Sequence, residues 1–293
     1  MTLLTQLWQL ILSGLTTGGI YALIAVGFVL IYNVTGILNF AQGEFVMLGA
    51  MLAITFFGAG LPLPVAAGGA VLSVVLVGAA VQRLALYPAR SASIIAQIII
   101  TIGVSISIRG VALLLWGTDP RPLPSFTAGE PLSLLGAVVV RQSLWVMAAA
   151  ALSVLALYLF FEHTVVGKAF RACIINRLAA RLMGISPERM ALLAFAASAG
   201  LGALGGVVVA PITLGTYDMG LMLGLKGFVA AVLGGLTNAQ GAILGGFLLG
   251  VVEALGAGII HSGYRDGISF FILLLVLLVR PSGLLGLVGT KRV

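Results

Sequence analysis

Long apolar stretches make up most of this chain, and short polar segments separate them. Several stretches, such as residues 94–116, are long enough to cross the ~30 Å hydrocarbon core of a bilayer as one helix. Hydrophobic residues make up 61% of the chain and charged residues 8%, which is too little polar surface for a water-soluble globule. Because backbone polar groups in lipid must pair within the protein, we predict an all-α, polytopic membrane helix bundle.

The spacing of the polar segments predicts a single transmembrane domain, residues 1–293, with about eight to ten membrane segments. Segment 45–57 follows a polar break at 33–45, and segment 227–236 covers only about half a crossing before a second break. Residues 212–226 are too mixed for a lipid-facing span, so we expect them on the outer side, together with the proline-rich stretch 117–133. The other expected segments are 10–32, 65–81, 94–116, 144–161, 190–210, a stretch that ends at 260, and 268–279.

The longest polar interval, residues 162–189, determines the expected orientation. It holds five of the chain's fifteen Lys and Arg residues and only two acidic residues, an excess that is typical of cytoplasmic segments. We therefore expect the N-terminus outside, the C-terminus in the cytoplasm, and nine segments between them. Residues 1–82 contain no Lys or Arg, so no cleavable signal peptide with a basic start is expected. The inner side then receives Arg83, Arg90, Lys168, Arg171, Arg177, Arg181, Arg189, Arg280, Lys291 and Arg292, and the outer side Arg121, Arg141, Lys226 and Arg265.

Two parts of the chain resemble each other weakly. Residues 27–50 and 227–250 share Gly-Phe-Val, a glycine-bearing break, Ala-Gln-Gly and a following run of small residues. Paired interrupted segments of this kind indicate a transport pathway, although glycine-rich membrane sequence can also match itself by chance. The second copy carries small residues every four positions, which favours close helix packing or contact with another copy of the chain: Gly241, Gly245, Gly246, Gly250, Ala254 and Gly258.

Three ionisable residues fall within or at the edge of apolar segments: Glu44, Arg109 and Glu253. A charge near the bilayer centre costs at least ~2.5–3.5 kcal/mol, so each should face protein or water. Arg109 could pair with Glu253 or with Glu44. The residues are then either structural ion pairs that hold helices in register or members of a pathway.

The sequence excludes several classes of protein. Cys173 is the sole cysteine, so neither an intrachain disulfide nor a cysteine-cluster metal site is possible. The two histidines are far apart in the sequence, and there is no Walker A, HExxH or GxSxG pattern. We expect no catalytic residues, no metal and no cofactor. The basic residues lie at the ends of apolar segments, where membrane orientation explains them without nucleic acid.

Four stretches carry a resemblance to a known family: YALIAVGFVLIYNVTGILNFAQGEFVMLGA at 21–50, GKAFRACIINRLAARLMGIS at 167–186, GLKGFVAAVLGGLTNAQGAILGG at 224–246 and RPSGLLG at 280–286. The chain resembles the LivH-type permease subunits of bacterial ABC importers for branched-chain amino acids over essentially its whole length. The resemblance implies a multi-pass permease of the bacterial inner (cytoplasmic) membrane. It also implies partners: a second homologous permease, two cytoplasmic ATP-binding subunits that hydrolyse ATP, a periplasmic substrate-binding protein, and membrane lipid.

The same resemblance assigns residues 162–190 as the segment that docks on the ATPase, called here the coupling segment. Apolar and basic residues alternate from Lys168 to Leu182 as in one amphipathic helix, which Gly184 can end, although such a helix could also lie on lipid headgroups. Arg109 departs from the family, where an uncharged polar residue is expected, and Cys173 and Asn176 receive no role. The residues expected to couple to the ATPase are Gly167, Arg171, Arg177, Ala179, Ala180, Gly184 and Ile185.

We therefore interpret the chain as a permease and not an enzyme, which carries branched-chain or related amino acids while other subunits hydrolyse ATP. The alternative is a stand-alone secondary transporter or channel that uses Glu44 and Glu253, and a membrane enzyme is the weakest alternative. Whether an amino acid or an amide is carried stays open. The pathway residues expected are Asn39, Gln42, Glu44, Arg109, Asn238, Gln240 and Glu253.

Overall fold

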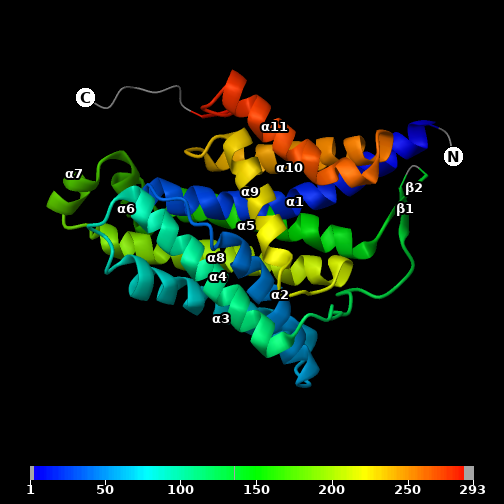
Figure 1. Ribbon diagram of the computed structural model, residues 1–293, viewed down its shortest axis with the longest axis horizontal. Helices are drawn as coiled ribbons and strands as arrows, with labels where there is room; N and C mark the ends of the chain where they lie inside the picture. Colours follow the sequence, from blue (N-terminus) through cyan, green and yellow to red (C-terminus); the bar gives the residue numbers. More distant parts are fainter. Residues whose placement is uncertain (1–2, 135, 287–293) are drawn as a thin grey trace.

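The computed structural model describes residues 3–134 and 136–286, and these form an elongated bundle of helices (Figure 1). The start of the first helix, at Leu3, and a small β-hairpin lie at one end of the long axis, and the short helices Val165–Ile175 and Arg177–Leu182 lie at the other. The helices are α1 (Leu3–Thr35), α2 (Gln42–Gly58), α3 (Leu63–Ala80), α4 (Ile94–Trp116), α5 (Arg141–His163), α6 (Val165–Ile175), α7 (Arg177–Leu182), α8 (Pro187–Thr213), α9 (Met219–Gly234), α10 (Ala239–Ile259) and α11 (Arg265–Val279). A π-helical turn, η1 (Val81–Leu86), extends α3, a 3₁₀ turn, η2 (Ser262–Tyr264), precedes α11, and β1 (Leu132–Leu134) pairs with β2 (Ala137–Val139).

Seven helices of the described residues are long and apolar enough to cross a membrane: α1, α3 with η1, α4, α5, α8, α10, and α11 with η2. Helices α2 and α9 are apolar but shorter, with 17 and 16 residues. These two are the segments that the sequence predicts to be short or interrupted. The helical multi-pass bundle is thus confirmed. Lys291 and Arg292, two of the expected inner-side residues, lie outside the described part of the chain.

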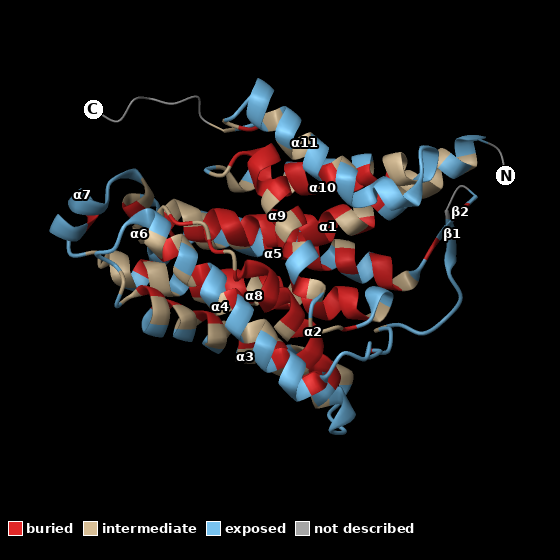
Figure 2. Ribbon diagram, in the orientation of Figure 1, coloured by how far each residue is buried: buried red, intermediate tan, exposed pale blue. Residues whose placement is uncertain are grey.

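Helix α1 forms the centre of the bundle, with 89% of its most apolar part buried, and it packs against α10, α8, α9 and α5. In contrast, the corresponding buried share is 17% for α4 and 6% for α11 (Figure 2). The apolar surfaces of these outer helices are what lipid or another membrane subunit covers.

The small residues of α10 pack inside the molecule. A Cβ at Gly250 would lie 2.4 Å from the carbonyl oxygen of Gly14 on α1, and one at Gly246 would lie 2.5 Å from the nitrogen of Ala22. On the other face of α10, a Cβ at Gly245 would lie 2.3 Å from the carbonyl oxygen of Ala230 on α9. Helices α1, α9 and α10 therefore meet backbone to backbone, so the predicted packing role is confirmed.

The two predicted breaks lie side by side. One separates α1 from α2, and the other separates α9 from α10; Gly36 and Gly235 adopt positive φ values of 73° and 108° there. The Asn33 Nδ2 donates to the carbonyl oxygen of Thr237 across 3.3 Å, which joins the two breaks directly. Both copies of the weak repeat therefore turn at the same place in the bundle.

The prediction that residues 212–226 lie on the outer side is wrong for its second half. Residues 219–226 form the first half of α9, where Gly220, Gly224 and Lys226 are buried. The polar character that argued against burial comes from Lys226, and its charge is neutralised within the protein by Glu253 at 2.9 Å.

Candidate functional site

A cavity of about 260 Å³ lies between α2, α4 and α9, next to the first break. Two ionisable residues, Glu44 and Arg109, line it together with mostly apolar side chains. We call it the Glu44 cavity. Its lining residues are Phe28, Phe40, Glu44, Ile102, Ser105, Ile106, Arg109, Gly220, Leu221, Gly224 and Leu225.

The break at 36–41 brings the start of α2 inside the bundle. The Asn39 side-chain oxygen accepts a hydrogen bond from the backbone amide of Ala41 at 3.2 Å. The backbone amide of Phe40 donates to the hydroxyl of Thr101 on α4 at 3.2 Å. Asn39, Ala41 and Thr101 are each fully buried. The non-helical backbone is thus satisfied by protein groups, which is the condition for its survival at membrane depth.

Glu44 lies in the first turn of α2, where the helix dipole favours a carboxylate. The residue is 1% exposed, and its Oε1 accepts from the hydroxyl of Ser105 at 2.8 Å. Its Oε2 is buried and has no hydrogen-bond partner among the described residues. The cavity therefore contains a carboxylate oxygen that no described residue satisfies.

Arg109 follows Ser105 by four residues on α4, so both face the same side of the helix. The side chain is half-buried and lines the cavity. Within the described residues no ion pair joins Arg109 to Glu44. The two charges share one cavity and remain separate.

Glycines bring α9 against the start of α2. A Cβ at Gly43 would lie 2.1 Å from the carbonyl oxygen of Gly220, and one at Gly220 would lie 3.1 Å from Glu44 Oε2. Sequence reasoning missed this wall, and also Ser105 and Phe40. The small-xxx-small spacing of Gly220 and Gly224 was the available signal, but it lies in the segment that was expected outside.

Glu253 belongs to a different cluster, and the predicted pair between Arg109 and Glu253 is wrong. Glu253 is fully buried and contacts Lys226 at 2.9 Å. Its other partners on α1 and α11 are the hydroxyls of Tyr21, at 3.1 Å, and Ser269, at 2.8 Å, and the Arg265 guanidinium. Lys226 also contacts Asp266 at 2.7 Å. All these contacts lie within the chain, as expected for a structural ion pair.

The other polar candidates do not line the cavity. Gln42 joins α2 to α8, because its Nε2 donates to the Ser198 carbonyl at 3.1 Å and its Oε1 accepts from the Ser198 hydroxyl at 2.6 Å. Asn238 caps α10 through the amides of Gln240 and Gly241, at 2.9 and 3.1 Å. Gln240 is exposed at the start of α10. Of the seven predicted pathway residues, the cavity collects Glu44 and Arg109.

The coupling segment forms two helices, so the prediction of one amphipathic helix from 168 to 182 is wrong. Asn176 has an extended backbone, and its side-chain oxygen accepts from the amides of Leu178 and Ala179 at 3.0 Å. It therefore ends α6 and caps α7, a common role for asparagine. Gly184 has a φ of 81° just after α7, which confirms the predicted helix stop.

The coupling segment is attached to the bundle by its inner face. The Arg177 guanidinium donates to the carbonyl oxygen of Val34 in the last turn of α1. Val34 also packs in a cluster with Phe170, Cys173 and Ala180. Cys173 is 1% exposed, and burial raises the pKa of its thiol, which agrees with an inert cysteine.

The outward face of the same segment is apolar and basic. Among its predicted residues Arg171, Arg177 and Ala179 are exposed, as is Gly184, whereas Ile185 is half-buried. Gly167 is buried, since a Cβ there would lie 2.1 Å from the Phe160 carbonyl oxygen. The most exposed of its large apolar side chains are Val165, Ile175, Leu178, Leu182 and Met183, which range from 68% to 83% exposed.

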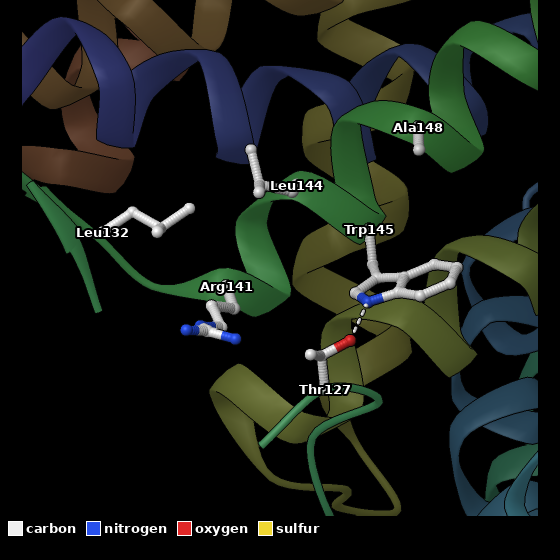
Figure 3. A pocket seen from close by; sticks show the side chains of 6 residues that line it. All are labelled: Thr127, Leu132, Arg141, Leu144, Trp145 and Ala148. Carbon is white, nitrogen blue, oxygen red and sulfur yellow. Dashed lines mark hydrogen bonds between the residues drawn. The ribbon is translucent and has the colours of Figure 1, made fainter. Parts of the chain in front are cut away.

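A second cavity, of about 430 Å³, lies at the end of the bundle near the β-hairpin (Figure 3). Trp145 of α5 donates to the Thr127 hydroxyl at 2.9 Å, and Arg141 donates to the carbonyl oxygen of Glu130 at 3.0 Å. Its lining is Thr127, Leu132, Arg141, Leu144, Trp145 and Ala148. The polar contacts fasten the segment before the hairpin to α5, and no carboxylate lines the space.

Comparison with known proteins gives consistent matches. Residues 10–277 match the family model described as branched-chain amino acid transport system / permease component. The high-affinity branched-chain amino acid transport system permease protein LivH of Salmonella typhimurium is 34% identical, with 97% of each chain covered. The corresponding permease protein BraD of Pseudomonas aeruginosa is also 34% identical, again with 97% of each chain covered. A probable LivH of Methanocaldococcus jannaschii is 28% identical over 95% of this chain and 92% of that protein.

Proposed function

This chain belongs to the family of permease components of branched-chain amino acid transport systems, and from that premise we propose how it works. It is a permease subunit of an importer and not an enzyme. It carries branched-chain or related amino acids across the bacterial inner membrane, and ATP hydrolysis in cytoplasmic partners drives the movement. The observation that carries the proposal is the contact between Arg177 and the end of α1.

That contact links a docking surface to the substrate cavity. The exposed apolar and basic face of α6 and α7 suits a groove with an acidic rim on a cytoplasmic partner. Arg177 binds the carbonyl oxygen of Val34, two residues before Gly36, where the break begins. A shift of α7 is therefore transmitted through the end of α1 to the break, to the start of α2 and to Glu44. The residues proposed to couple are Gly167, Arg171, Arg177, Ala179, Ala180, Gly184 and Ile185.

The proposed orientation has the N-terminus outside, the C-terminus inside and nine membrane segments. The seven long helices count as crossings, and α2 and α9 count as two shorter ones. Both breaks and the basic coupling segment then lie at the cytoplasmic end (Figure 1). The Lys and Arg excess of the coupling segment supports this side.

A second permease subunit is proposed to cover the Glu44 cavity. Ile102, Ile106 and Leu221 at its rim are 41%, 57% and 44% exposed, and the charged Arg109 lies among them. A charged side chain in the membrane must face protein or water rather than lipid. The pathway is thus completed between two permeases. Two ATP-binding subunits at α6 and α7 and a substrate-binding protein at the hairpin end complete the importer.

Substitution of Arg177 tests the coupling. We expect Arg177→Ala to lower leucine uptake by about tenfold or more, because the loss of one charge-assisted hydrogen bond is worth ~1.5–3 kcal/mol. The variant should still assemble with its ATPase partners and hydrolyse ATP. The measurement is uptake and hydrolysis by the same reconstituted importer.

The matched control is Arg280→Ala, an exposed arginine directly after α11 and outside the coupling segment. It should transport as the unaltered protein does. Normal uptake by Arg177→Ala would refute the coupling route. Uptake by this chain alone, driven by an ion gradient with no ATPase present, would favour the alternative of a secondary transporter that uses the buried Glu44.

A further inference from the structure

We propose that the Glu44 cavity selects its substrate as an intact zwitterion, with Glu44 binding an α-ammonium group and Arg109 an α-carboxylate. The inference rests on the proposed function and names the substrate class of the same cavity. It excludes amides, urea and singly charged acids or amines as good substrates.

The ammonium subsite follows from the unsatisfied oxygen of Glu44. This residue is 1% exposed, its Oε1 accepts a hydrogen bond from Ser105, and its Oε2 has no partner in residues 3–134 and 136–286. A buried carboxylate oxygen without a donor is unfavourable, so a ligand N–H that reaches this oxygen would relieve that cost. An ammonium group supplies three N–H donors and a compensating charge. The surrounding wall is the backbone of Gly220 and Gly224, which permits close approach.

The carboxylate subsite follows from Arg109. A guanidinium presents donors in a planar fork that matches a carboxylate, and it is always charged. None of the ion pairs among the described residues uses Arg109, whereas Lys226 and Arg265 both contact Glu253. Within the described residues, Arg109 thus lines a membrane cavity without forming an ion pair. A substrate carboxylate provides the missing charge.

The separation of the two charges is what favours a zwitterion. Had Arg109 paired with Glu44 directly, the cavity would offer no net attraction to either end of an amino acid. Instead no ion pair joins them within the described residues, and Glu44 accepts a hydrogen bond from Ser105, which lies one helical turn before Arg109 on α4. A ligand that carries only one charge would satisfy one residue and leave the other desolvated and unpaired.

The remaining lining accommodates a small apolar side chain. Phe28, Phe40, Ile102, Ile106, Leu221 and Leu225 supply aromatic and aliphatic surface. The volume of about 260 Å³ exceeds the space of one water, about 30 Å³, and lies below the roughly 300–1,000 Å³ of drug-sized pockets. A single aliphatic amino acid matches this size and polarity.

Binding to this chain assembled with the second permease subunit in lipid nanodiscs, without the substrate-binding protein, tests the inference. The probe is radiolabelled L-leucine, displaced by unlabelled leucine, by 4-methylpentanoic acid, which lacks the ammonium group, and by 3-methylbutylamine, which lacks the carboxylate. We expect leucine to bind at least about tenfold more tightly than either analogue, because each analogue loses one charge-assisted interaction.

Variants that remove one of the two charges should then each lose a different part of the ligand selectivity. Glu44→Gln should lose the preference for leucine over the acid and keep the preference over the amine. Arg109→Gln should lose the preference over the amine and keep the preference over the acid. Asp119→Asn and Arg90→Gln, which change exposed charges outside the cavity, should bind as the unaltered chain does.

Each result decides the question. Absence of leucine binding, equal affinity for all three ligands, or an equal loss for every ligand in both variants overturns the zwitterion subsite. If Glu44→Gln fails to fold, which size-exclusion chromatography shows, the pattern of Arg109→Gln decides alone. Such failures leave the proposed function standing as long as the assembled importer takes up leucine with ATP, since that assay is separate.

Discussion

At the scale of single residues, the two buried glutamates differ in how far hydrogen bonds and ion pairs compensate them. Glu253 is surrounded by donors from three helices, so its charge is compensated within the protein. Glu44 is equally buried, but in the described part of the chain only one of its oxygens has a hydrogen-bond partner. Because unpaired buried charges are costly, the difference separates a residue that stabilises the bundle from one that we propose binds a ligand.

Substitution of Glu253 tests the structural role. Glu253→Gln leaves Lys226 and Arg265 with less compensating charge, and we expect a loss of ~3–5 kcal/mol in the free energy of unfolding. Thermal unfolding in detergent measures the change. The double variant Glu253→Gln with Lys226→Met should recover part of the loss, because it removes the buried cation as well. A Glu253→Gln protein as stable as the unaltered chain would show that the cluster does not hold α9, α10 and α11 together.

At the scale of helices, glycine decides which elements can approach. Helices α1, α9 and α10 meet along glycine and alanine positions, and α2 meets α9 through Gly43, Gly220 and Gly224. Without a hydrophobic force between helices in lipid, van der Waals contact of this kind drives association. Helix α4 has no such contacts at its own glycines, since a Cβ at Gly103 or Gly110 would meet no atom within 4 Å.

A matched pair of Gly→Ala changes tests this contrast. At Gly250 a new Cβ would lie 2.4 Å from backbone atoms of α1, so we expect Gly250→Ala to destabilise the protein by ~1–3 kcal/mol through overpacking. Gly103→Ala meets open space, and its better helix propensity should leave stability equal or slightly higher. Thermal unfolding of both variants in the same detergent is the measurement. Equal losses would mean that α1 and α10 separate easily.

At the scale of the whole molecule, the sidedness of the bundle underlies the proposed mechanism. The coupling segment and both breaks lie together at one end, and the hairpin lies at the other (Figure 1). ATP-binding partners can reach the breaks only if that first end is cytoplasmic. Cys173 cannot report on this, because it is buried against α1 and α8.

Introduced cysteines test the sidedness. Two single-cysteine variants are made in a Cys173→Ala chain. Leu182→Cys is on α7, where Leu182 is 82% exposed, and Asp119→Cys is in the exposed segment after α4. A membrane-impermeant maleimide should label Asp119→Cys in intact cells and Leu182→Cys only after permeabilisation. Labelling of Leu182→Cys from outside would invert the bundle and remove the proposed contact with the ATPase.

The sequence by itself determined the features that depend on local composition. It determined the apolar helices, with α4 at residues 94–116 as predicted, the two breaks, the stop at Gly184 and the family. Such features follow from hydrophobicity and backbone preference, which neighbouring residues supply.

Only the tertiary structure decided which groups meet. It placed Lys226 inside the bundle, gave Glu253 its partners, turned Gln42 toward Ser198, and left Glu44 and Arg109 in one cavity. The physical reason is that a buried polar residue is stabilised by partners from distant helices, and sequence spacing does not specify which helices touch. Asn176 is an intermediate case. Its preference for capping a helix is local, but whether it interrupts a continuous helix depends on how α6 and α7 pack on α1 and α8.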